Sequence, residues 1–326
     1  MRVRYIAEIG NNHNGDINLA KEMIDAAIDT GVNYVKFQIY NIDKFLHRDS
    51  IYYKDFVAES LSFEDFRELQ GYTEAKGCQF FATPFDEDSL SLLNEIGLNM
   101  VKIASGDMNN EQLLLQAIKM SKQLIVSVGG ATLDEIDAMV RFLNDHNARF
   151  SILHCIINYP ARFEELNLGF IDTLKKRYSC PVGFSDHSPG IEASLAAIAL
   201  GATIIEKHFT TNRALSGGDN EMSVLPEEFR RLVREGNNIA LAIGDGNRKL
   251  SEDEQKVKDL IRRVFFAKHA VPKGTQFTDE NLLLLRPNIA GEGFDASFFS
   301  SLQKCRAACD LEEGQLITRE MIDGMA

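Results

Sequence analysis

The chain has 326 residues and a formal net charge of −13, with 44% hydrophobic and 25% charged residues. This composition allows a full buried core, and the length fits one domain of about 250 residues followed by a smaller one. The negative charge would repel a nucleic-acid backbone, and no long Lys/Arg cluster reverses it locally. No stretch approaches the roughly 20 apolar residues of a membrane span, and no secretory leader is recognised, so a soluble cytoplasmic protein is expected.

Five cysteines are scattered along the chain without a CxxC pair. In a cytoplasmic setting they are expected to be reduced thiols. Cys305 and Cys309 have helical spacing, but no histidine partners accompany them, so a zinc site is not expected there.

In chain order, short runs of β-branched residues alternate with longer amphipathic segments for about 240 residues. Strands are predicted at Arg4–Ile9, Tyr34–Gln38, Gln79–Thr83, Met100–Ala104, Gln123–Val128, Phe150–Cys155, Pro181–Phe184 and Thr203–Lys207. Intervening helices are predicted in segments such as Asn18–Thr30, Asp86–Ile96, Leu133–Asn144 and Ile191–Leu200. Eight such units favour a closed (β/α)₈ TIM barrel over an open doubly wound sheet, since no GxGxxG follows the first strand.

The barrel is assigned to residues 1–246, because the pattern changes beyond them. Residues 247–263 predict a charged linker helix, and residues 264–326 predict a small β-rich domain. That domain contains a repeat in which VPKGTQFTDENL pairs with LEEGQLITREMI. A doubled unit of this kind indicates a compact pseudo-symmetric fold of about 60 residues, near the lower limit for independent folding.

Polar side chains at the carboxyl ends of barrel strands are the candidates for function, because TIM barrels carry their active sites on that face. This criterion selects Glu8, Lys36, Gln38, Thr83, Lys102, Ser105, Ser127, Tyr159, Ser185, Asp186, His187, Glu206 and His208. The loop IGNNHNG follows the first strand at the same end. Its Asn-Gly pair is typical of a turn, and His13 is either part of that turn or a neighbour of the site.

Two histidines, His187 and His208, end adjacent predicted strands. Each could satisfy a hydrogen bond in the core, but two imidazoles on neighbouring strand ends favour a shared divalent ion. An ion held by two neutral imidazoles, with water and substrate completing its shell, would act as a Lewis acid. Mn²⁺ is the first choice, with Mg²⁺ or Co²⁺ as alternatives.

Two lysines, Lys36 and Lys102, interrupt otherwise apolar strands, where an unpaired ammonium would be costly. Either an anionic substrate or a buried ion pair with Glu8 or Glu206 would offset that cost, and the two can coexist. Glu8 and Glu206 are themselves candidate general acid/base groups, with a purely structural role as the alternative.

Seven motifs, AEIGNNHNG, VKFQ, ATPF, VKIASGD, ILHCIINYP, GFSDHS and IIEKHF, occur in this order at the predicted strand ends. Together they resemble the N-acetylneuraminate (sialic acid) synthase family, and the tail resembles that family's antifreeze-like (SAF) domain, a β-clip fold. The resemblance covers nearly the whole chain. It implies condensation of phosphoenolpyruvate with an N-acetylmannosamine-type amino sugar and water, with release of phosphate, to give a sialic-acid-like (nonulosonic) acid.

The resemblance also implies a role for every selected strand-end residue except Asp186. The catalytic groups would be Glu8, Lys36, Lys102 and Glu206. Phosphoenolpyruvate would contact Lys36, Thr83, Lys102, Ser105, Ser127, Tyr159 and Ser185, the sugar would contact Gln38, Asp107, Tyr159, Asp219 and Arg286, and the metal would be held by His187 and His208. The family's homodimer is interlocked, and Arg286 in LLLLRPN matches the arginine that the antifreeze-like domain sends to the partner's sugar site.

Several positions depart from the family pattern. The loop NRALSGGDNEMSVLP keeps Asp219 but lacks the two prolines common there, and CIINYP carries Ile157 where asparagine is usual. Phe37 replaces a common histidine and Asp107 a common glutamate. These departures leave the sugar open among N-acetylmannosamine, its 6-phosphate and a 2,4-diacetamido-6-deoxyhexose. The alternatives in function are a catalytically inactive sugar-binding homologue and another phosphosugar lyase on the same barrel.

Overall fold

The computed structural model describes residues 2–120, 123–287 and 292–324. They form two compact units, of which the first ends at Asp245 and the second begins at Gly246. The first unit contains an eight-stranded sheet, and the second contains two short two-stranded sheets.

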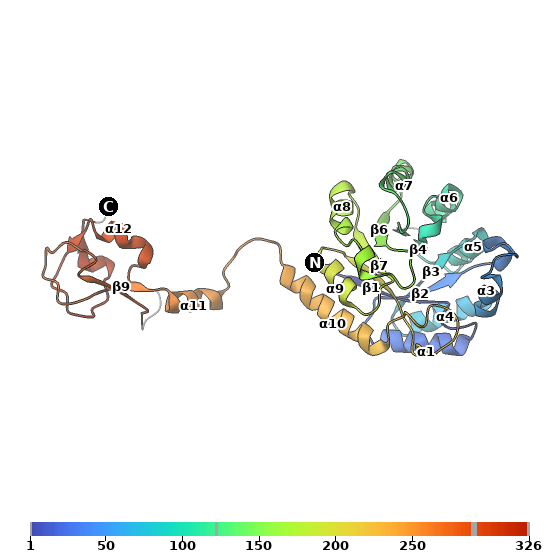
Figure 1. The fold of residues 1–326 in the computed structure, drawn as a ribbon, viewed down its shortest axis with the longest axis horizontal. Coiled ribbons are helices and arrows are strands. Elements are labelled where there is room, and N and C mark those ends of the chain that lie inside the picture. The colour runs from blue at the N-terminus through green and yellow to red at the C-terminus, as the bar shows by residue number, and fades with distance from the viewer. Residues whose placement is uncertain (1, 121–122, 288–291, 325–326) are drawn as a thin grey trace. The chain divides into compact units, whose positions relative to one another are not determined.

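The sheet of the first unit has the strand order β3-β2-β1-β8-β7-β6-β5-β4, and its hydrogen-bonded pairs are parallel. The two outermost strands, β3 and β4, also contact each other, which closes the sheet into the predicted barrel (Figure 1). The strands are β1 (Arg4–Gly10), β2 (Tyr34–Ile39), β3 (Gln79–Pro84), β4 (Met100–Ile103), β5 (Gln123–Ser127), β6 (Phe150–Cys155), β7 (Val182–Asp186) and β8 (Ile204–His208). The predicted last two strands ended too early, since β7 runs to Asp186 and β8 to His208.

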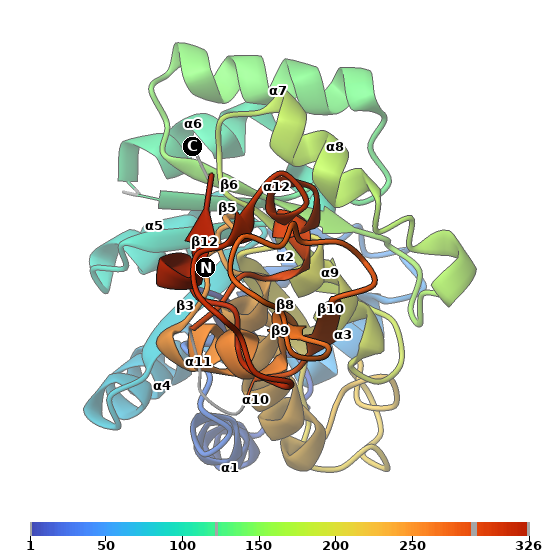
Figure 2. The same ribbon diagram turned by 90° about the vertical axis from the view of Figure 1, so that its left-hand side faces the viewer.

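Helices lie around the outside of the strands (Figures 1 and 2). The chain begins several of them with a side-chain cap, as at Asp16, whose carboxylate accepts from the backbone amides of Asn18 and Leu19. These helices are α1 (Ile17–Ile28), α4 (Phe63–Ala75), α5 (Glu87–Glu95), α6 (Glu111–Met120), α7 (Leu133–Asp145), α8 (Phe170–Arg177), α9 (Glu192–Ala199) and α10 (Pro226–Ile243). Short 3₁₀ turns cover Ser105–Asp107 (η1) and Phe163–Glu165 (η2).

Side-chain alternation along the strands divides the barrel into two faces. The outward residues pack with the helices in one large apolar core. Inward residues form a separate apolar layer made by Ile6, Phe81, Met100, Ile125, Leu153 and Ile204. Two residues further along each of these strands the inward position is polar or ionisable, as with Glu8 after Ile6 and Glu206 after Ile204. The apolar layer therefore forms the floor of a polar pocket.

Two short helices between β2 and α4, α2 (Ile42–Phe45) and α3 (Tyr53–Glu59), were not predicted from the sequence. Aromatic contacts hold them at the carboxyl end of the barrel, where the Phe45 ring lies 4.4 Å from that of Phe85 and 5.5 Å from that of Phe56. The segment is too short and too mixed in composition to show a helical period.

The second unit has α11 (Glu252–Ile261), β9 (Val264–Ala267), β10 (Leu282–Leu285), η3 (Ala296–Phe298), α12 (Phe299–Leu302), β11 (Arg306–Ala307), η4 (Arg319–Met321) and β12 (Ile322–Asp323). The sequence repeat reappears as matched hydrogen bonds, because Gly274 N donates to Ala307 O and Gly314 N donates to Ala267 O, both at 2.8 Å. Val271 and Leu311 donate to each other. Residues 288–291 and 325–326 of the domain predicted here lie outside the described residues.

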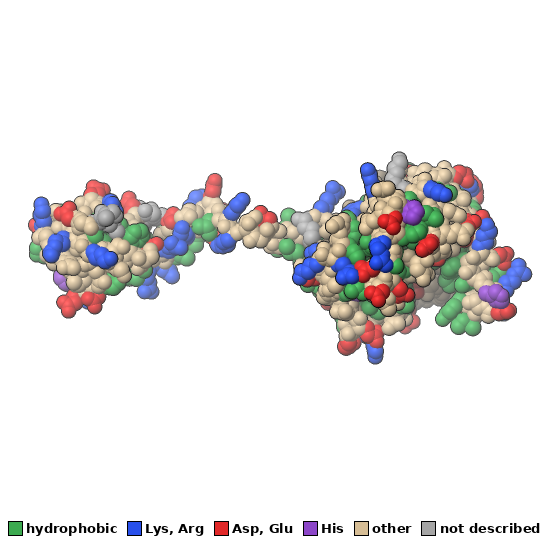
Figure 3. Space-filling model, turned by 90° about the horizontal axis from the view of Figure 1, so that it is seen from above, with side chains coloured by type: hydrophobic (Ala, Val, Ile, Leu, Met, Phe, Trp, Pro, Cys, Tyr) green, Lys and Arg blue, Asp and Glu red, His purple; other side chains and the backbone are tan. Residues whose placement is uncertain are grey.

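On the face of the barrel unit seen in Figure 3, Lys/Arg and Asp/Glu side chains are intermingled rather than gathered into a basic patch. Among the described residues, no helix is both long and apolar enough to cross a membrane.

Candidate active site

The strand ends of the barrel enclose a cavity of about 490 Å³, which we call the inner pocket. It collects thirteen of the fifteen residues that were predicted to form the site. These are Glu8, Lys36, Gln38, Thr83, Lys102, Ser105, Ser127, Tyr159, Ser185, His187, Glu206, His208 and Asp219.

Two lysines and two glutamates form a buried charge cluster in the inner pocket. Lys36 Nζ lies 2.7 Å from Glu8 Oε2 and 3.7 Å from Glu206 Oε2, and Lys102 Nζ lies 3.4 Å from Glu206 Oε1. All four side chains are 6% exposed or less. The buried ion pair considered from the sequence is therefore present, and it brings both lysines to the cavity wall.

Several polar atoms of this cluster have no hydrogen-bond partner within the protein. Glu8 Oε2, Ser127 Oγ and Glu206 Oε2 are buried without a hydrogen bond, although Lys36 Nζ lies 2.7 Å from the first and 3.7 Å from the last as an ion-pair partner. Buried polar atoms are almost always satisfied in folded proteins, so a set of exceptions around one cavity indicates a ligand site.

The two glutamates differ in protonation. Burial raises the pKa of Glu8 to about 7, although Lys36 acts against that shift. Burial also raises the pKa of Glu206, but Lys102, Lys36 and the hydrogen bond from Ser185 outweigh it and lower that pKa to about 2. Near neutral pH, Glu206 is a carboxylate, whereas burial favours the protonated form of Glu8. Such a divergence is typical of acid/base pairs in active sites.

The two predicted metal ligands lie side by side, with the rings of His187 and His208 5.4 Å apart. His187 Nδ1 donates to Ile156 O at 2.6 Å, so its Nε2 carries the lone pair and lies 3.1 Å from Tyr159 Oη. His208 Nδ1 is buried without a hydrogen-bond partner, 3.5 Å from Asp219 Oδ2. Burial lowers the pKa of both imidazoles to about 3, which keeps them neutral, the form that binds metals.

The histidine pair fits a divalent ion as a partial shell. The described residues contain no group of three or more His, Cys, Asp or Glu side chains arranged to hold a metal. His187 and His208 therefore offer two nitrogen ligands, one of them unpartnered, and other positions would fall to water or substrate.

A second cavity of about 620 Å³, the outer pocket, shares Gln38, Tyr52, Phe56 and Asp219 with the inner pocket. Its remaining wall comes from Asn11, Asn14, Asp55, Ala58, Glu59, Ser216, Gly217 and Gly218. The unpredicted helix α3 thus lines both cavities. The loop that departs from the family pattern closes one side of the outer pocket.

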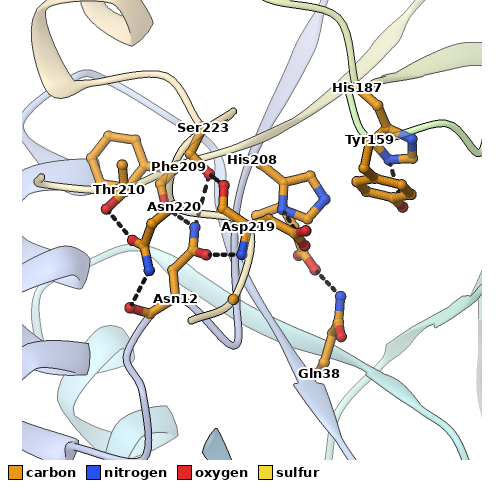
Figure 4. A network of polar contacts seen from close by, with 12 residues as sticks. Asn12, Gln38, Tyr159, His187, His208, Phe209, Thr210, Asp219, Asn220 and Ser223 are labelled. Carbon is orange, nitrogen blue, oxygen red and sulfur yellow. Dashed lines mark hydrogen bonds and ion pairs between the residues drawn. The ribbon is translucent and has the colours of Figure 1, made fainter. Parts of the chain in front are cut away.

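Asn12 holds that loop in place (Figure 4). Its Oδ1 accepts from Asp219 N at 2.7 Å, and its Nδ2 donates to Phe209 O and Ser223 Oγ, both at 2.9 Å. Asn220 returns a contact to Asn12 O at 3.3 Å. Asn12 received no role from the sequence, because nothing in the loop IGNNHNG signals a partner about 200 residues away.

Asp186 and Lys207 form a second buried ion pair, on the outward face of the strands that carry the histidines. Lys207 Nζ lies 3.0 Å from Asp186 Oδ2 and donates to Ser188 O at 2.6 Å. Asp186 also accepts from Ser188 and Ser194, so this pair ties the ends of β7 and β8 to α9. The strand-end criterion selected Asp186, but side-chain alternation turns it away from the cavity.

Four further positions singled out in the sequence do not line the inner pocket. Asp107 lies in η1, where it accepts from Asn110 Nδ2 at 3.1 Å, and it is not on the wall of either pocket. Arg286 belongs to the second unit. His13 accepts from Gly15 N within its own turn, and Phe37 is fully buried against Phe80. The replacement at position 37 therefore lies in the core and not at the sugar.

An eight-stranded α/β barrel with a lysine and carboxylate pocket at the carboxyl ends of its strands defines a TIM-barrel enzyme. Residues 23–248 match the family model described as the NeuB family, and the chain belongs to that family. It is 37% identical to N,N'-diacetyllegionaminic acid synthase of Campylobacter jejuni, over 96% of this chain and 98% of that protein. It is 30% identical to human N-acetylneuraminate-9-phosphate synthase, over 98% of this chain and 92% of that one.

A solved structure is similar as well. The N-acetylneuraminic acid (sialic acid) synthetase of Leptospira borgpetersenii, in complex with citrate, is 40% identical to this chain and superposes with a TM-score of 0.76. The match covers 79% of this chain and 90% of the synthetase. The family resemblance inferred from the motifs is therefore confirmed. The named relatives differ in their sugars.

Proposed function

We propose that this enzyme joins phosphoenolpyruvate to the aldehyde carbon of an N-acylated amino sugar and adds water, releasing inorganic phosphate and a nonulosonic acid. The observation that carries the proposal is the inner pocket, in which two buried lysines and unsatisfied polar oxygens surround one cavity. Membership of the NeuB family supports the same reaction class.

Phosphoenolpyruvate binds in the inner pocket under this proposal. Lys36 and Lys102 offset the charge of its phosphate and carboxylate, and the hydroxyls of Thr83, Ser105, Ser127 and Ser185 donate to its oxygens. Lys36 already donates to Thr83 Oγ1 at 2.9 Å, so one hydroxyl is oriented before the substrate arrives. Tyr159 stacks on His187 and closes the wall toward the sugar.

Proton movement falls to the two glutamates. Glu8, whose carboxyl holds a proton near neutral pH, supplies it to the oxygen of the sugar carbonyl as the new carbon–carbon bond forms. Glu206 stays ionised between Lys102 and Lys36 and accepts a proton from the water that adds to the former enol carbon. Gln38 donates to Glu8 Oε1 at 3.2 Å and fixes that carboxyl in position.

His187 and His208 would hold a divalent ion, Mn²⁺ in the first instance and Mg²⁺ or Co²⁺ as alternatives. When bound, the ion supplies Lewis-acid polarisation of the sugar carbonyl.

The oligomer and the compartment are also part of the proposal. The family resemblance supports an interlocked homodimer of a cytoplasmic enzyme, in which the antifreeze-like domain at residues 264–326 brings Arg286 to the partner's sugar site. Mixing inactive Arg286→Ala and His208→Ala chains tests this, because half of randomly formed dimers would contain one intact site. About a quarter of the wild-type activity should return. No recovery in verified mixed dimers would contradict the shared site.

The reaction itself is tested by phosphate release from phosphoenolpyruvate with a panel of N-acylated amino sugars and Mn²⁺. Phosphate release is expected to require sugar and metal together. The mass of the product should equal the masses of both substrates plus one water, minus phosphoric acid. Failure of a metal-loaded, folded sample to release phosphate with any such sugar would overturn the proposal.

A further inference from the structure

The outer pocket differs from the inner pocket in charge. Asp55, Glu59 and Asp219 line it, and no Lys, Arg or His stands among its described lining residues. A neighbouring pocket that shares Gly218 and Asp219 does contain an arginine, Arg213, but that guanidinium is paired with Glu228. The cavities that adjoin Asp219, apart from the lysine-lined inner pocket, are therefore rich in carboxylates.

Glu59 is a built part of the outer pocket and not an incidental surface acid. Glu59 is only 8% exposed, and its Oε1 accepts a hydrogen bond from Gly218 N at 2.6 Å. Gly217 and Gly218 have positive φ angles of 78° and 53°. A Cβ on Gly217 would stand 2.8 Å from Glu59 Oε1 and 2.9 Å from Asn14 Oδ1, so only glycine permits this approach. Gly217 and Gly218 thus seat the loop on Glu59.

One further atom points to a ligand in this region. Asn14 Oδ1 is buried without a hydrogen-bond partner, and Asn14 lines the outer pocket. Asp219 lines both pockets and so connects this wall with the inner pocket. A ligand that extends from the inner pocket past Asp219 would therefore meet hydrogen-bond acceptors and negative charge.

We propose that the outer pocket takes the distal end of an uncharged N-acylated sugar and rejects a sugar phosphate, with Asp55 and Glu59 as the specificity-determining residues. This inference rests on the proposed function. Hydroxyl and amide N–H groups of a neutral sugar donate to carboxylates and to an amide oxygen. A phosphate offers only acceptors at neutral pH, and its charge would be repelled by the three carboxylates, which outnumber the one guanidinium that the partner's Arg286 would add in the proposed dimer.

The test compares a neutral N-acylated amino hexose with its 6-phosphate as partners for phosphoenolpyruvate in the full-length metal-loaded enzyme. The wild-type kcat/KM is expected to favour the neutral sugar by at least about 100-fold. In Asp55→Asn/Glu59→Gln that ratio should fall at least about tenfold, mainly through a lower KM for the phosphorylated sugar. Both substitutions keep the shape of the side chain, and the amide oxygen introduced at position 59 is still able to accept from Gly218 N.

The matched control is Asp145→Asn, which removes one exposed carboxylate at the far end of α7 and should leave the ratio unchanged. Asp55→Asn alone changes an exposed side chain and keeps the test informative if the Glu59 variant unfolds. Equal or better use of the phosphorylated sugar by the wild type, or an unchanged ratio in the folded variants, would overturn the inference. Absence of phosphate release with both sugars would instead count against the proposed function.

Discussion

The inner and outer pockets are neighbours with opposite electrostatic character. The inner pocket is bounded by strand ends and contains two buried lysines. The outer pocket is bounded by α3 and a glycine-containing loop, and its charged residues, among those described, are Asp55, Glu59 and Asp219. Asp219, Gln38, Tyr52 and Phe56 belong to both.

This difference suggests that the inner pocket determines the class of reaction and the outer pocket determines which sugar is used. Rigid parallel strands fix the charges that a common anionic substrate needs, and loops at the same end of the barrel vary without disturbing them. The NeuB family accordingly includes relatives with different named sugars on one barrel. Substitutions in the two pockets should therefore have distinguishable kinetic effects.

The largest effect is expected from Lys102→Met in the inner pocket. The change removes a cation from the pocket proposed for phosphoenolpyruvate and leaves Glu206 with one lysine partner, so kcat/KM for phosphoenolpyruvate should fall by about 10³-fold. Steady-state kinetics at saturating sugar measure this. Lys119→Met on the exposed face of α6 is the control. A folded Lys102 variant with an unaltered kcat/KM would refute the role of the inner pocket.

Lys207→Met tests the structural role of the buried ion pair on the outward face of β7 and β8. The change leaves Asp186 as an uncompensated buried charge, so the free energy of unfolding should fall by about 3–5 kcal/mol. Chemical denaturation measures the loss. Lys176→Met, which breaks an exposed i,i+4 pair, should cost less than about 1 kcal/mol. Equal costs for the two variants would show that the buried pair does not stabilise the strand ends.

The inner pocket should also make the rate depend on pH through Glu8. Burial raises the pKa of this carboxyl from 4.5 to about 7, so the proton it donates is lost as pH rises through 7. Between pH 7 and pH 8 the protonated fraction falls about fivefold, and kcat should follow it. The Glu8→Gln variant should be slower and should lack this limb. A limb that persists in that variant would assign the ionisation to another group.

The smallest effect is expected from Asn12→Ala, behind the outer pocket. Loss of the contacts to Asp219 N, Phe209 O and Ser223 Oγ loosens the loop, whose Asp219 lines both pockets, but leaves the lysines and hydroxyls of the inner pocket in place. The KM for sugar should rise about threefold, with the KM for phosphoenolpyruvate unchanged. Equal increases in both KM values would mean that the loop does not act on the sugar alone.

The two pockets also differ in how far the sequence predicts them. Strand-end residues such as Lys36 and His208 were placed correctly, because parallel strands bring their carboxyl ends to one edge whatever the details of packing. The barrel order and the repeat in the second unit follow from equally local signals. The inward polar layer could be read from side-chain alternation alone.

The wall of the outer pocket could not be predicted in this way. Glu59 and Asn12 act on a loop more than about 150 residues away, and helix α3 shows no usable period. Asp186 was selected by its place at a strand end, whereas alternation with Ser185 and His187 turns its side chain outward to Lys207. Phe37 looked like a change at the sugar and is a core residue, since its side chain points outward from β2.

The formation of a carbon–carbon bond is the central claim, and one measurement tests it most directly. Phosphoenolpyruvate labelled with ¹³C at C3 is incubated with the metal-loaded enzyme and a neutral N-acylated amino hexose, and the product is followed by NMR. The account predicts that the labelled carbon becomes a methylene carbon bonded to the former aldehyde carbon of the sugar, and that it does so as phosphate appears. Label found only in the methyl group of pyruvate would show hydrolysis without condensation and would contradict the account.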